Sequence, residues 1–142
     1  MSATTTPTTT RADRLADVVR ERDLHALLVT DLSNVRWLTG FTGSNGAAVV
    51  GTDGTRRFVT DFRYLTQAAE QLDDSWSREI SSDLLEGIAR QLPDEGDLRL
   101  GFDDVNMSVR NREKLGRLVR EGIELVPAGG TVEGLRVVKD AE

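Results

Sequence analysis

The 142-residue sequence contains no cysteine, which excludes disulfide bonds and thiolate metal sites. The absence is compatible with a reducing cytoplasm, and we expect a cytoplasmic protein. The sequence has a single histidine, His25, with no second ligand residue at metal-site spacing. We therefore interpret His25 as a strand-end residue, and neither a histidine metal site nor a serine–histidine triad is supported.

Long apolar runs are also absent, since no stretch approaches the roughly 18 residues that a membrane helix needs. The 18 basic and 24 acidic residues give a net charge of −6, and the two signs are mixed along the chain. A nucleic-acid footprint would need a basic face. We expect a soluble protein without nucleic-acid or membrane partners, long enough to bury the core of one domain.

Strand and helix patterns alternate along most of the chain. Met1 to Thr10 is almost entirely Ser, Thr, Ala and Pro, which predicts a disordered tail instead of a signal peptide. Thr10 and Asp13 resemble a capping box at the start of a helix that ends near Asp23. The apolar run from His25 to Val29 has the length of a buried central strand.

The later elements follow the same alternation. The sequence predicts strands at Ser75–Ile80, Leu98–Phe102 and Ile123–Val126, a helix from Ser81 or Ser82 to Leu92, and a helix from Ser108 to Glu121 with Gly122 at its C-cap. This order indicates an α/β layered domain on a mixed sheet.

The most distinctive segment runs from Asn34 to Tyr64. Gly40, Gly43 and Gly46 recur at every third position between a short helix and an apolar run. Glycine permits backbone angles and close approaches that a side chain forbids. Phosphate binding is disfavoured because the loop enters a strand and lacks a P-loop lysine. The loop either contacts a ligand or is a closely packed turn.

A hairpin and a helix start follow this loop. Thr52 to Thr55, with a central Asp-Gly pair, separates two strand-like runs and predicts an antiparallel turn. Asp61 is a candidate N-cap for a helix whose apolar stripe is Leu65, Ala68, Ala69 and Leu72. Arg63 and Tyr64 would lie in its first turn, near the glycine loop if the hairpin brings the two together. Arg63 would either serve a site or simply pair with Asp61.

Two acidic pairs, Asp73-Asp74 and Asp103-Asp104, lie between predicted elements. Aspartate commonly caps or turns the chain in such connections. Neither pair has a partner base or a metal-ligand pattern, so we interpret both as structural.

The string from Asn34 to Gly46, NVRWLTGFTGSNG, followed by Thr60-Asp61-Phe62-Arg63-Tyr64, resembles the N-terminal domain of the creatinase, prolidase and aminopeptidase P family. The bacterial Xaa-Pro aminopeptidases are the most similar. The likeness extends along the chain after its first ten residues. Val132 to Asp140 is similar to the segment that leads into the family's catalytic domain. The resemblance therefore implies a domain at 11–130, of roughly six strands flanked by helices, and the start of a linker at 131–142.

In that family, catalysis takes place in a C-terminal domain of the "pita-bread" fold. Two divalent metal ions, Mn²⁺ or similar, are held there by two aspartates, a histidine and two glutamates. They activate water for attack on the amide before proline. None of these ligands can be assigned in the present sequence, so we expect this chain alone to lack peptidase activity and to hold no metal or catalytic residue.

For the N-terminal domain itself, the resemblance implies a homodimer whose loops shape the substrate entrance of the neighbouring subunit. In related creatinases, the loop corresponding to Thr42–Gly46 reaches substrate across the dimer interface. The candidates carried over from the family are Ser44 and Asn45 as substrate contacts, Phe41 and Trp37 as wall or packing residues, and Arg63 and Tyr64 as loop supports or cleft residues. Arg36-Trp37 stands where related sequences often have tyrosine.

These expectations combine into one function. The chain is expected to be the non-catalytic N-terminal domain of a metal-dependent Xaa-Pro aminopeptidase that acts on proline-containing peptides. Two alternatives stay open: a prolidase that cleaves Xaa-Pro dipeptides, and a peptidase-like module that has lost activity and binds other proteins.

Overall fold

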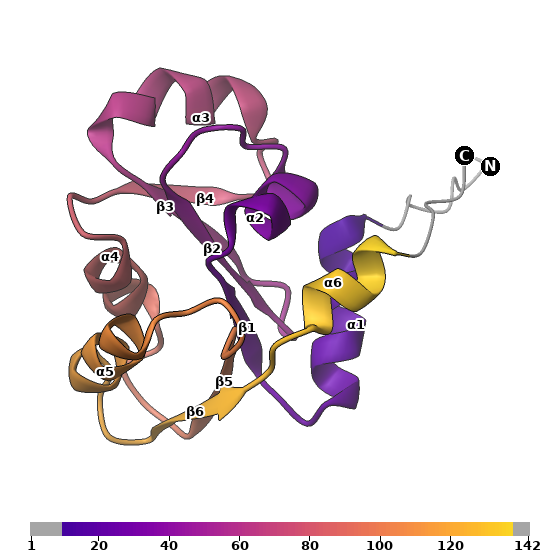
Figure 1. The fold of residues 1–142 in the computed structure, drawn as a ribbon, viewed down its shortest axis with the longest axis vertical. Coiled ribbons are helices and arrows are strands. Elements are labelled where there is room, and N and C mark those ends of the chain that lie inside the picture. Colours follow the sequence, from indigo (N-terminus) through magenta and orange to yellow (C-terminus); the bar gives the residue numbers. More distant parts are fainter. Residues whose placement is uncertain (1–9, 138–142) are drawn as a thin grey trace.

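The computed structural model describes residues 10–137, in which strands and helices alternate (Figure 1). The strands are β1 (Ala26–Val29), β2 (Gly46–Gly51), β3 (Arg56–Thr60), β4 (Ser77–Ile80), β5 (Leu98–Phe102) and β6 (Ile123–Pro127). The helices are α1 (Arg11–Glu21), α2 (Leu32–Thr39), α3 (Leu65–Gln71), α4 (Leu84–Gln91), α5 (Val109–Leu118) and α6 (Thr131–Arg136), with a 3-10 turn, η1 (Phe62–Tyr64), before α3.

All six strands form one sheet in the order β4-β3-β2-β1-β5-β6. β2 runs antiparallel to both of its neighbours, whereas the β1–β5, β5–β6 and β3–β4 pairs are parallel. Five strands therefore end at the same edge of the sheet, and β2 begins there. The predicted mixed, six-stranded α/β architecture is confirmed.

The two ends of the strands define two edges of the sheet. The carboxyl edge comprises the glycine loop before β2, the last residue of β4, and the segments that follow the five parallel strands up to the first residue of the next α-helix, at 30–32, 40–46, 61–65, 80–84, 103–109 and 128–131. The amino edge comprises the connections at the opposite end, at 22–25, 52–55, 72–76, 92–97 and 119–122.

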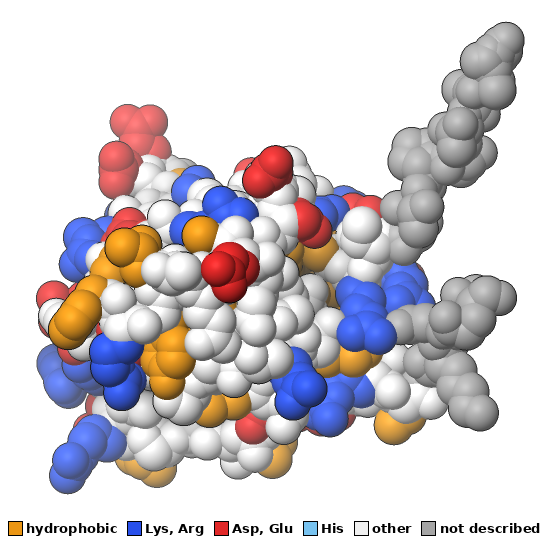
Figure 2. Space-filling view, turned by 90° about the horizontal axis from the view of Figure 1, so that it is seen from above, with side chains coloured by type: hydrophobic (Ala, Val, Ile, Leu, Met, Phe, Trp, Pro, Cys, Tyr) orange, Lys and Arg blue, Asp and Glu red, His pale blue; other side chains and the backbone are white. Residues whose placement is uncertain are grey.

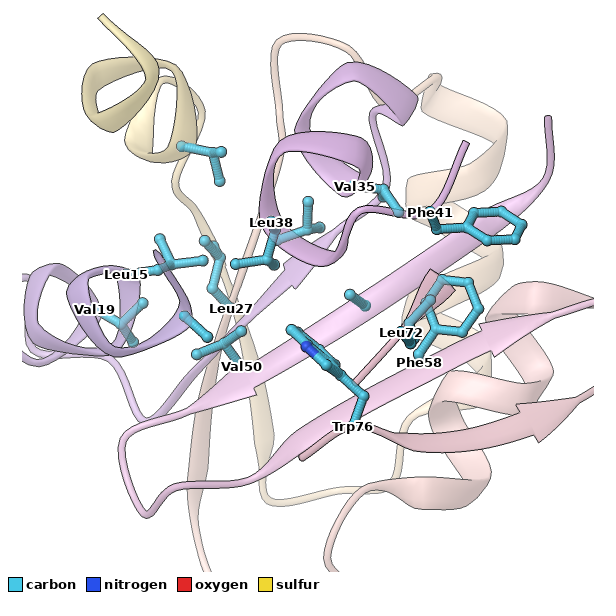
Figure 3. Close-up of a cluster of buried hydrophobic side chains, with 14 of the residues drawn as sticks. Leu15, Val19, Leu27, Val35, Leu38, Phe41, Val50, Phe58, Leu72 and Trp76 are labelled. Carbon is cyan, nitrogen blue, oxygen red and sulfur yellow. The ribbon is translucent and has the colours of Figure 1, made fainter. Parts of the chain in front are cut away.

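Helices cover both faces of the sheet, which makes a three-layer domain (Figure 1). One core cluster joins α1, α2, α3 and α6 to the sheet and includes Leu15, Val35, Phe58 and Val132, and part of it is drawn in Figure 3. The other joins α4 and α5 to the opposite face. β1 lies in the middle with all four residues buried, which explains its uninterrupted apolar run.

The predicted start of α1 is confirmed in detail. The Thr10 hydroxyl accepts a hydrogen bond from the Asp13 amide at 3.0 Å, and the Asp13 carboxylate accepts one from the Thr10 amide at 3.0 Å. These two bonds form the capping box. His25 lies exposed just before β1, where its Nδ1 accepts a hydrogen bond from the Arg99 amide at 2.8 Å. It is a strand-end residue, as expected.

Two predicted helix ends are wrong. α4 is capped by Asp83, whose carboxylate accepts from the Glu86 amide at 3.2 Å, and not by Ser81 or Ser82. Ser81 instead bonds the backbone of Asp83. α5 ends at Leu118, because Val119 is already extended, and Gly122 turns the chain before β6 with a φ of +100°. Gly122 was predicted as the C-cap of this helix, and its left-handed conformation instead serves the turn into β6.

The stripe predicted for α3 is half right. Ala68 and Leu72 are buried, but Leu65 and Ala69 are exposed. The chain enters α3 through the 3-10 turn η1, so α3 is only seven residues long and a single turn contacts the core.

The hairpin between β2 and β3 is confirmed, although only Gly54 has a positive φ, at +93°. Asp53 instead accepts a hydrogen bond from the Thr55 amide at 3.0 Å. The acidic pairs also turn the chain, since Asp73 accepts from the Ser75 amide and Asp103 from the Val105 and Asn106 amides. Their structural interpretation is confirmed.

Residues 131–136, predicted as the start of a linker, form helix α6 against α1 and α2. The buried Asn34 side chain holds α6, donating to Glu133 at 3.0 Å and accepting from Arg136 at 2.9 Å. The tail predicted at residues 1–10 and the last part of the linker lie outside the described residues, except for Thr10 and Val137.

Candidate functional site

The structure brings the glycine loop and the start of the next helix together at the carboxyl edge. In the β2–β3 ladder Gly46 pairs with Thr60, so Asn45 and Asp61, one residue beyond each, lie side by side. The Thr60 hydroxyl also donates a hydrogen bond to the Asn45 carbonyl. The β2–β3 hairpin therefore brings the two halves of the 34–64 segment together.

Asp61 is the centre of this cluster. Its carboxylate accepts from the Asn45 side-chain amide at 2.8 Å, and from Nε and Nη2 of Arg63 at 2.9 and 2.8 Å. It also caps η1 by accepting from the Arg63 amide at 3.0 Å. The hydrogen bonds from Arg63, followed by that from Asn45, hold the pKa of the Asp61 carboxyl well below its usual range. The sequence predicted the cap but missed this wider role.

Arg63 and Tyr64 both support the loop. The Arg63 guanidinium pairs with Asp61 and lies 5.2 Å from the centroid of the Tyr64 ring. The Tyr64 hydroxyl shares a hydrogen bond with the Ser44 hydroxyl. This bond is the main reason that the pKa of Tyr64 is lowered. The sequence left two roles open for Arg63, one in a site and one as the ion-pair partner of Asp61. The structure shows the ion pair with Asp61.

Phe41 lies inside the core, with 1 % of its surface exposed. Its ring makes an edge-on contact with Phe58 at 4.8 Å between centroids (Figure 3). A second edge-on contact joins it to Tyr64 at 5.5 Å between centroids. Phe41 therefore packs beneath the loop and does not form an exposed wall.

The three glycines accommodate this packing in different ways. Gly40 ends α2 with a φ of +83°, a conformation that favours glycine. A Cβ atom at Gly43 would lie 2.3 Å from the Phe41 ring, and one at Gly46 would lie 3.1 Å from it. At Gly43 and Gly46 the requirement is space for an aromatic side chain.

Trp37 lies apart from this cluster, half-buried between α1 and α2. The Arg11 guanidinium lies 4.9 Å from the Trp37 ring centroid and donates to the Trp37 carbonyl at 2.8 Å. The structure therefore assigns Trp37 to helix packing and does not join it to Ser44 or Asn45.

Two loop supports were missed in the sequence. Gln71 accepts a hydrogen bond from the Thr42 amide at 2.9 Å, and Gln67 donates to the Thr42 hydroxyl at 2.9 Å. Both glutamines project from α3. Their i, i+4 spacing placed them on one helix face, but nothing local in the sequence showed that this face meets Thr42.

Ser44 and Asn45 border a groove of about 450 Å³ at the carboxyl edge. On its other side lie Asp83, the cap of α4, and Lys114 of α5, which form an ion pair across the two helices. The hydrogen bond from Lys114 lowers the pKa of Asp83. Ser44 is exposed, so its polar atoms are accessible to a molecule in the groove.

No metal centre is present in the part of the chain that the structure describes. Within residues 10–137, no three His, Cys, Asp or Glu side chains are grouped so that they could hold an ion. The aspartates of the carboxyl edge instead cap helices, as Asp31, Asp61 and Asp83 do, or accept hydrogen bonds from turn amides, as Asp103 and Asp104 do. Over the same residues, no helix has the length and hydrophobicity to cross a membrane. In the view of Figure 2, acidic and basic side chains are interspersed.

The structure is thus a six-stranded α/β domain with one antiparallel strand and a glycine loop braced by η1 and α3 at its carboxyl edge. Residues 11–138 match the model of the creatinase/prolidase N-terminal domain, and the chain belongs to this family. The family expected from the 34–64 segment is confirmed.

Among curated relatives, the peptidase YqhT of Bacillus subtilis is 33 % identical over 132 residues, covering 93 % of this chain and 37 % of YqhT. Xaa-Pro aminopeptidase 2 of Mus musculus is 43 % identical over 76 residues, covering 51 % of this chain and 11 % of that protein. The chain thus spans well under half the length of the curated relatives it matches.

Solved structures agree with the fold. The N-terminal domain of the cytoplasmic peptidase PepQ from Mycobacterium tuberculosis is 37 % identical with a TM-score of 0.85, covering 91 % of this chain and all of that one. The Xaa-Pro dipeptidase of Bacillus anthracis is 25 % identical with a TM-score of 0.80, covering 92 % of this chain and 36 % of that one.

Proposed function

We propose that this chain is the non-catalytic N-terminal domain of a cytoplasmic, metal-dependent Xaa-Pro aminopeptidase. It would supply homodimer contacts and part of the entrance through which proline-containing peptides reach the catalytic centre. The family membership supports the peptidase assignment, as do relatives named as Xaa-Pro aminopeptidases. The structural support comes from the carboxyl edge.

The observation that carries the proposal is the distribution of exposed apolar side chains. Phe62, Val105 and Val109 are 77 %, 73 % and 74 % exposed. Six of the seven large hydrophobic residues exposed within residues 10–137 belong to the carboxyl edge: Leu32, Phe62, Leu65, Ile80, Val105 and Val109. The seventh, Val137, follows α6. Exposed apolar residues gathered at one end of a domain are typical of a protein-binding surface.

The groove beside Ser44 and Asn45 lies at the same edge. Asn45 is held by Asp61, and Ser44 by Tyr64, so both side chains have one defined position before any ligand arrives. Such preorganisation reduces the entropy lost on binding. A neighbouring protein surface that covers the apolar residues would therefore enclose polar groups already placed to contact a peptide.

The metal ions would be held elsewhere. The described residues do not fit a two-metal site, so the two divalent ions, Mn²⁺ or similar, are assigned to a catalytic domain of the whole protein. This chain contributes no step of the hydrolysis itself.

The test begins with the protein as its own cell makes it, isolated by immunoprecipitation and weighed by intact mass spectrometry. We expect a product longer by a domain of about 200 residues. That product should release the first residue of an Ala-Pro-Ala peptide only when Mn²⁺ or a similar ion is present. A product of the present length, or one that is inactive with every divalent metal, would contradict the proposal and support a binding module.

A prolidase is the second candidate, because the B. anthracis Xaa-Pro dipeptidase has the same domain with a TM-score of 0.80. Peptides of graded length separate the two. An aminopeptidase cleaves Ala-Pro-Ala and longer peptides, whereas a prolidase cleaves only Ala-Pro.

A further inference from the structure

A second cavity, of about 260 Å³, lies at the amino edge, on the opposite side of the molecule from the groove. The hairpin turn 52–55 and the segment 91–98, from the end of α4 to the start of β5, surround it. Pockets for drug-sized ligands are about 300–1,000 Å³. This one therefore suits a smaller molecule.

The floor of the cavity is apolar. Val49 of β2, Leu92 at the end of α4 and Leu98 of β5 contribute to it, and the first two are almost completely buried. Leu98 is half-buried, so a ligand with an aliphatic body would cover its exposed part and contact the other two side chains.

The rim offers charged side chains that make no hydrogen bond. Arg57 and Asp97 both line the cavity, and within residues 10–137 neither side chain makes a hydrogen bond or a salt bridge. Hydrogen bonds from Thr55, followed by the nearby charge of Arg57, lower the pKa of Asp53 on the same rim. Asp53, the other carboxylate of the rim, already accepts a hydrogen bond from the Thr55 amide. Arg57 and Asp97 are thus a cation and an anion that face one small cavity with their bonding capacity unused.

His25 adds a further donor. Its Nδ1 accepts a hydrogen bond from the Arg99 amide at 2.8 Å, so the neutral ring carries its proton on Nε2. His25 also lines the cavity. Two donors, Arg57 and His25, and two carboxylates, Asp53 and Asp97, therefore surround an apolar floor, and of the two carboxylates only Asp97 accepts no hydrogen bond from the described residues.

We propose that this cavity binds a small zwitterion with an apolar body, namely a free aliphatic amino acid. The carboxylate of the ligand would bond Arg57 and His25, its ammonium group would bond Asp97, and its side chain would contact the apolar floor and cover Leu98. Charge-assisted hydrogen bonds of this kind are the strong ones. The inference does not depend on the proposed peptidase function, because the cavity lies at the other edge of the sheet.

The test is a titration of the ¹⁵N-labelled 142-residue chain with L-leucine, followed by NMR. We expect saturable shifts of the amides at 52–55 and 91–98, with a Kd of about 1 mM or lower. Two analogues each lack one charge: 4-methylpentanoate has no ammonium group and 3-methylbutylamine has no carboxylate. Each should bind about tenfold more weakly, since it leaves one charge of the protein unpaired.

Variants locate the site. Arg57→Gln and Asp97→Asn should each weaken leucine binding about tenfold and change the melting temperature little, because neither side chain makes a hydrogen bond or salt bridge within the described residues and the attraction between the partly exposed Arg57 and Asp53 is weak. Arg117→Gln, at an exposed position of α5, is the matched control and should bind as the unaltered chain does. No saturable shift at about 10 mM leucine, equal binding of 4-methylpentanoate, or unchanged binding by both cavity variants would overturn the proposal.

Discussion

The two edges of the sheet use their polar residues in opposite ways. At the carboxyl edge, Asp61 and Asp83 are engaged as caps and in ion pairs, Asp103 accepts hydrogen bonds from turn amides, and large apolar side chains are exposed between them. At the amino edge, none of the seven exposed large hydrophobic residues occurs, whereas the Arg57 and Asp97 side chains line a cavity and make no hydrogen bond within the described residues.

This difference indicates two kinds of contact. Apolar side chains around satisfied polar groups suit a broad protein surface, because covering them leaves no buried charge unpaired. Unpaired charges around a small apolar cavity suit a small ligand that brings charges of its own. Loop length does not explain this difference in polar and apolar exposure, since both edges consist of short segments that connect the same set of strands and helices.

The largest expected effect is on the free energy of unfolding, and it differs between two phenylalanines of the carboxyl edge, Phe41 and Phe62. Phe41→Ala should lower the free energy of unfolding by about 3–5 kcal/mol, because it empties a fully packed position. Phe62→Ala, the control, should change it by less than about 0.5 kcal/mol. Urea denaturation of the two variants measures both values. Equal losses would show that Phe62 is not a free surface residue.

The glycine loop gives the next effect. Gly43→Ala should cost about 1–3 kcal/mol, because the added methyl group displaces the Phe41 ring. Gly134→Ala, in α6 with open space around it, should be neutral or stabilise by up to about 1 kcal/mol. A bulkier Gly43→Val is therefore expected to impair folding as well as dimer formation or substrate capture. Matching melting curves for Gly43→Ala and the unaltered chain would refute the packing role of this glycine.

Removing the charge of one carboxylate at each edge compares the two edges directly. Asp61→Asn should lower the melting temperature at pH 7, whereas Asp97→Asn should leave it unchanged. The folded-state pKa of Asp61 is lowered, so its contribution is complete above the unfolded pKa of about 3.9 and is lost as pH falls through the folded value. The gap between the Asp61→Asn and unaltered melting temperatures should therefore be constant from pH 7 to about 4 and shrink below that. A gap that grows on acidification would contradict this assignment.

The smallest effect is spectroscopic. Tyr64 is the only tyrosine of the chain, so its ionisation can be followed alone by ultraviolet absorbance. The hydrogen bond with Ser44 holds the Tyr64 pKa below its ordinary value. Ser44→Ala should raise it toward about 10, with little change in stability. An unchanged pKa would mean that the bond between the loop and η1 does not persist in solution.

The sequence predicted the elements better than their contacts. Local sequence patterns were enough to predict the strand segments and the capping box of Thr10, because these depend on neighbouring residues, whereas the six-stranded sheet was implied by the family resemblance. The end of α5 was wrong, since the extended backbone at Val119 has no local signal and Gly122 looked like a C-cap. The pair of Asn45 with Asp61 depends on the β2–β3 register, which only the folded hairpin fixes. Phe41 was a candidate for the entrance because a loop aromatic does not show from its sequence whether it points into the core.

The most direct test of the central claim, that the carboxyl edge is the surface covered by protein, is hydroxyl-radical footprinting. It compares the protein as its cell makes it with the isolated 142-residue chain. We expect Phe62, Leu65 and Val109 to be labelled in the isolated chain and protected in the natural protein, while Pro93 at the amino edge is labelled equally in both. Equal labelling of Phe62 in the two samples would contradict the account.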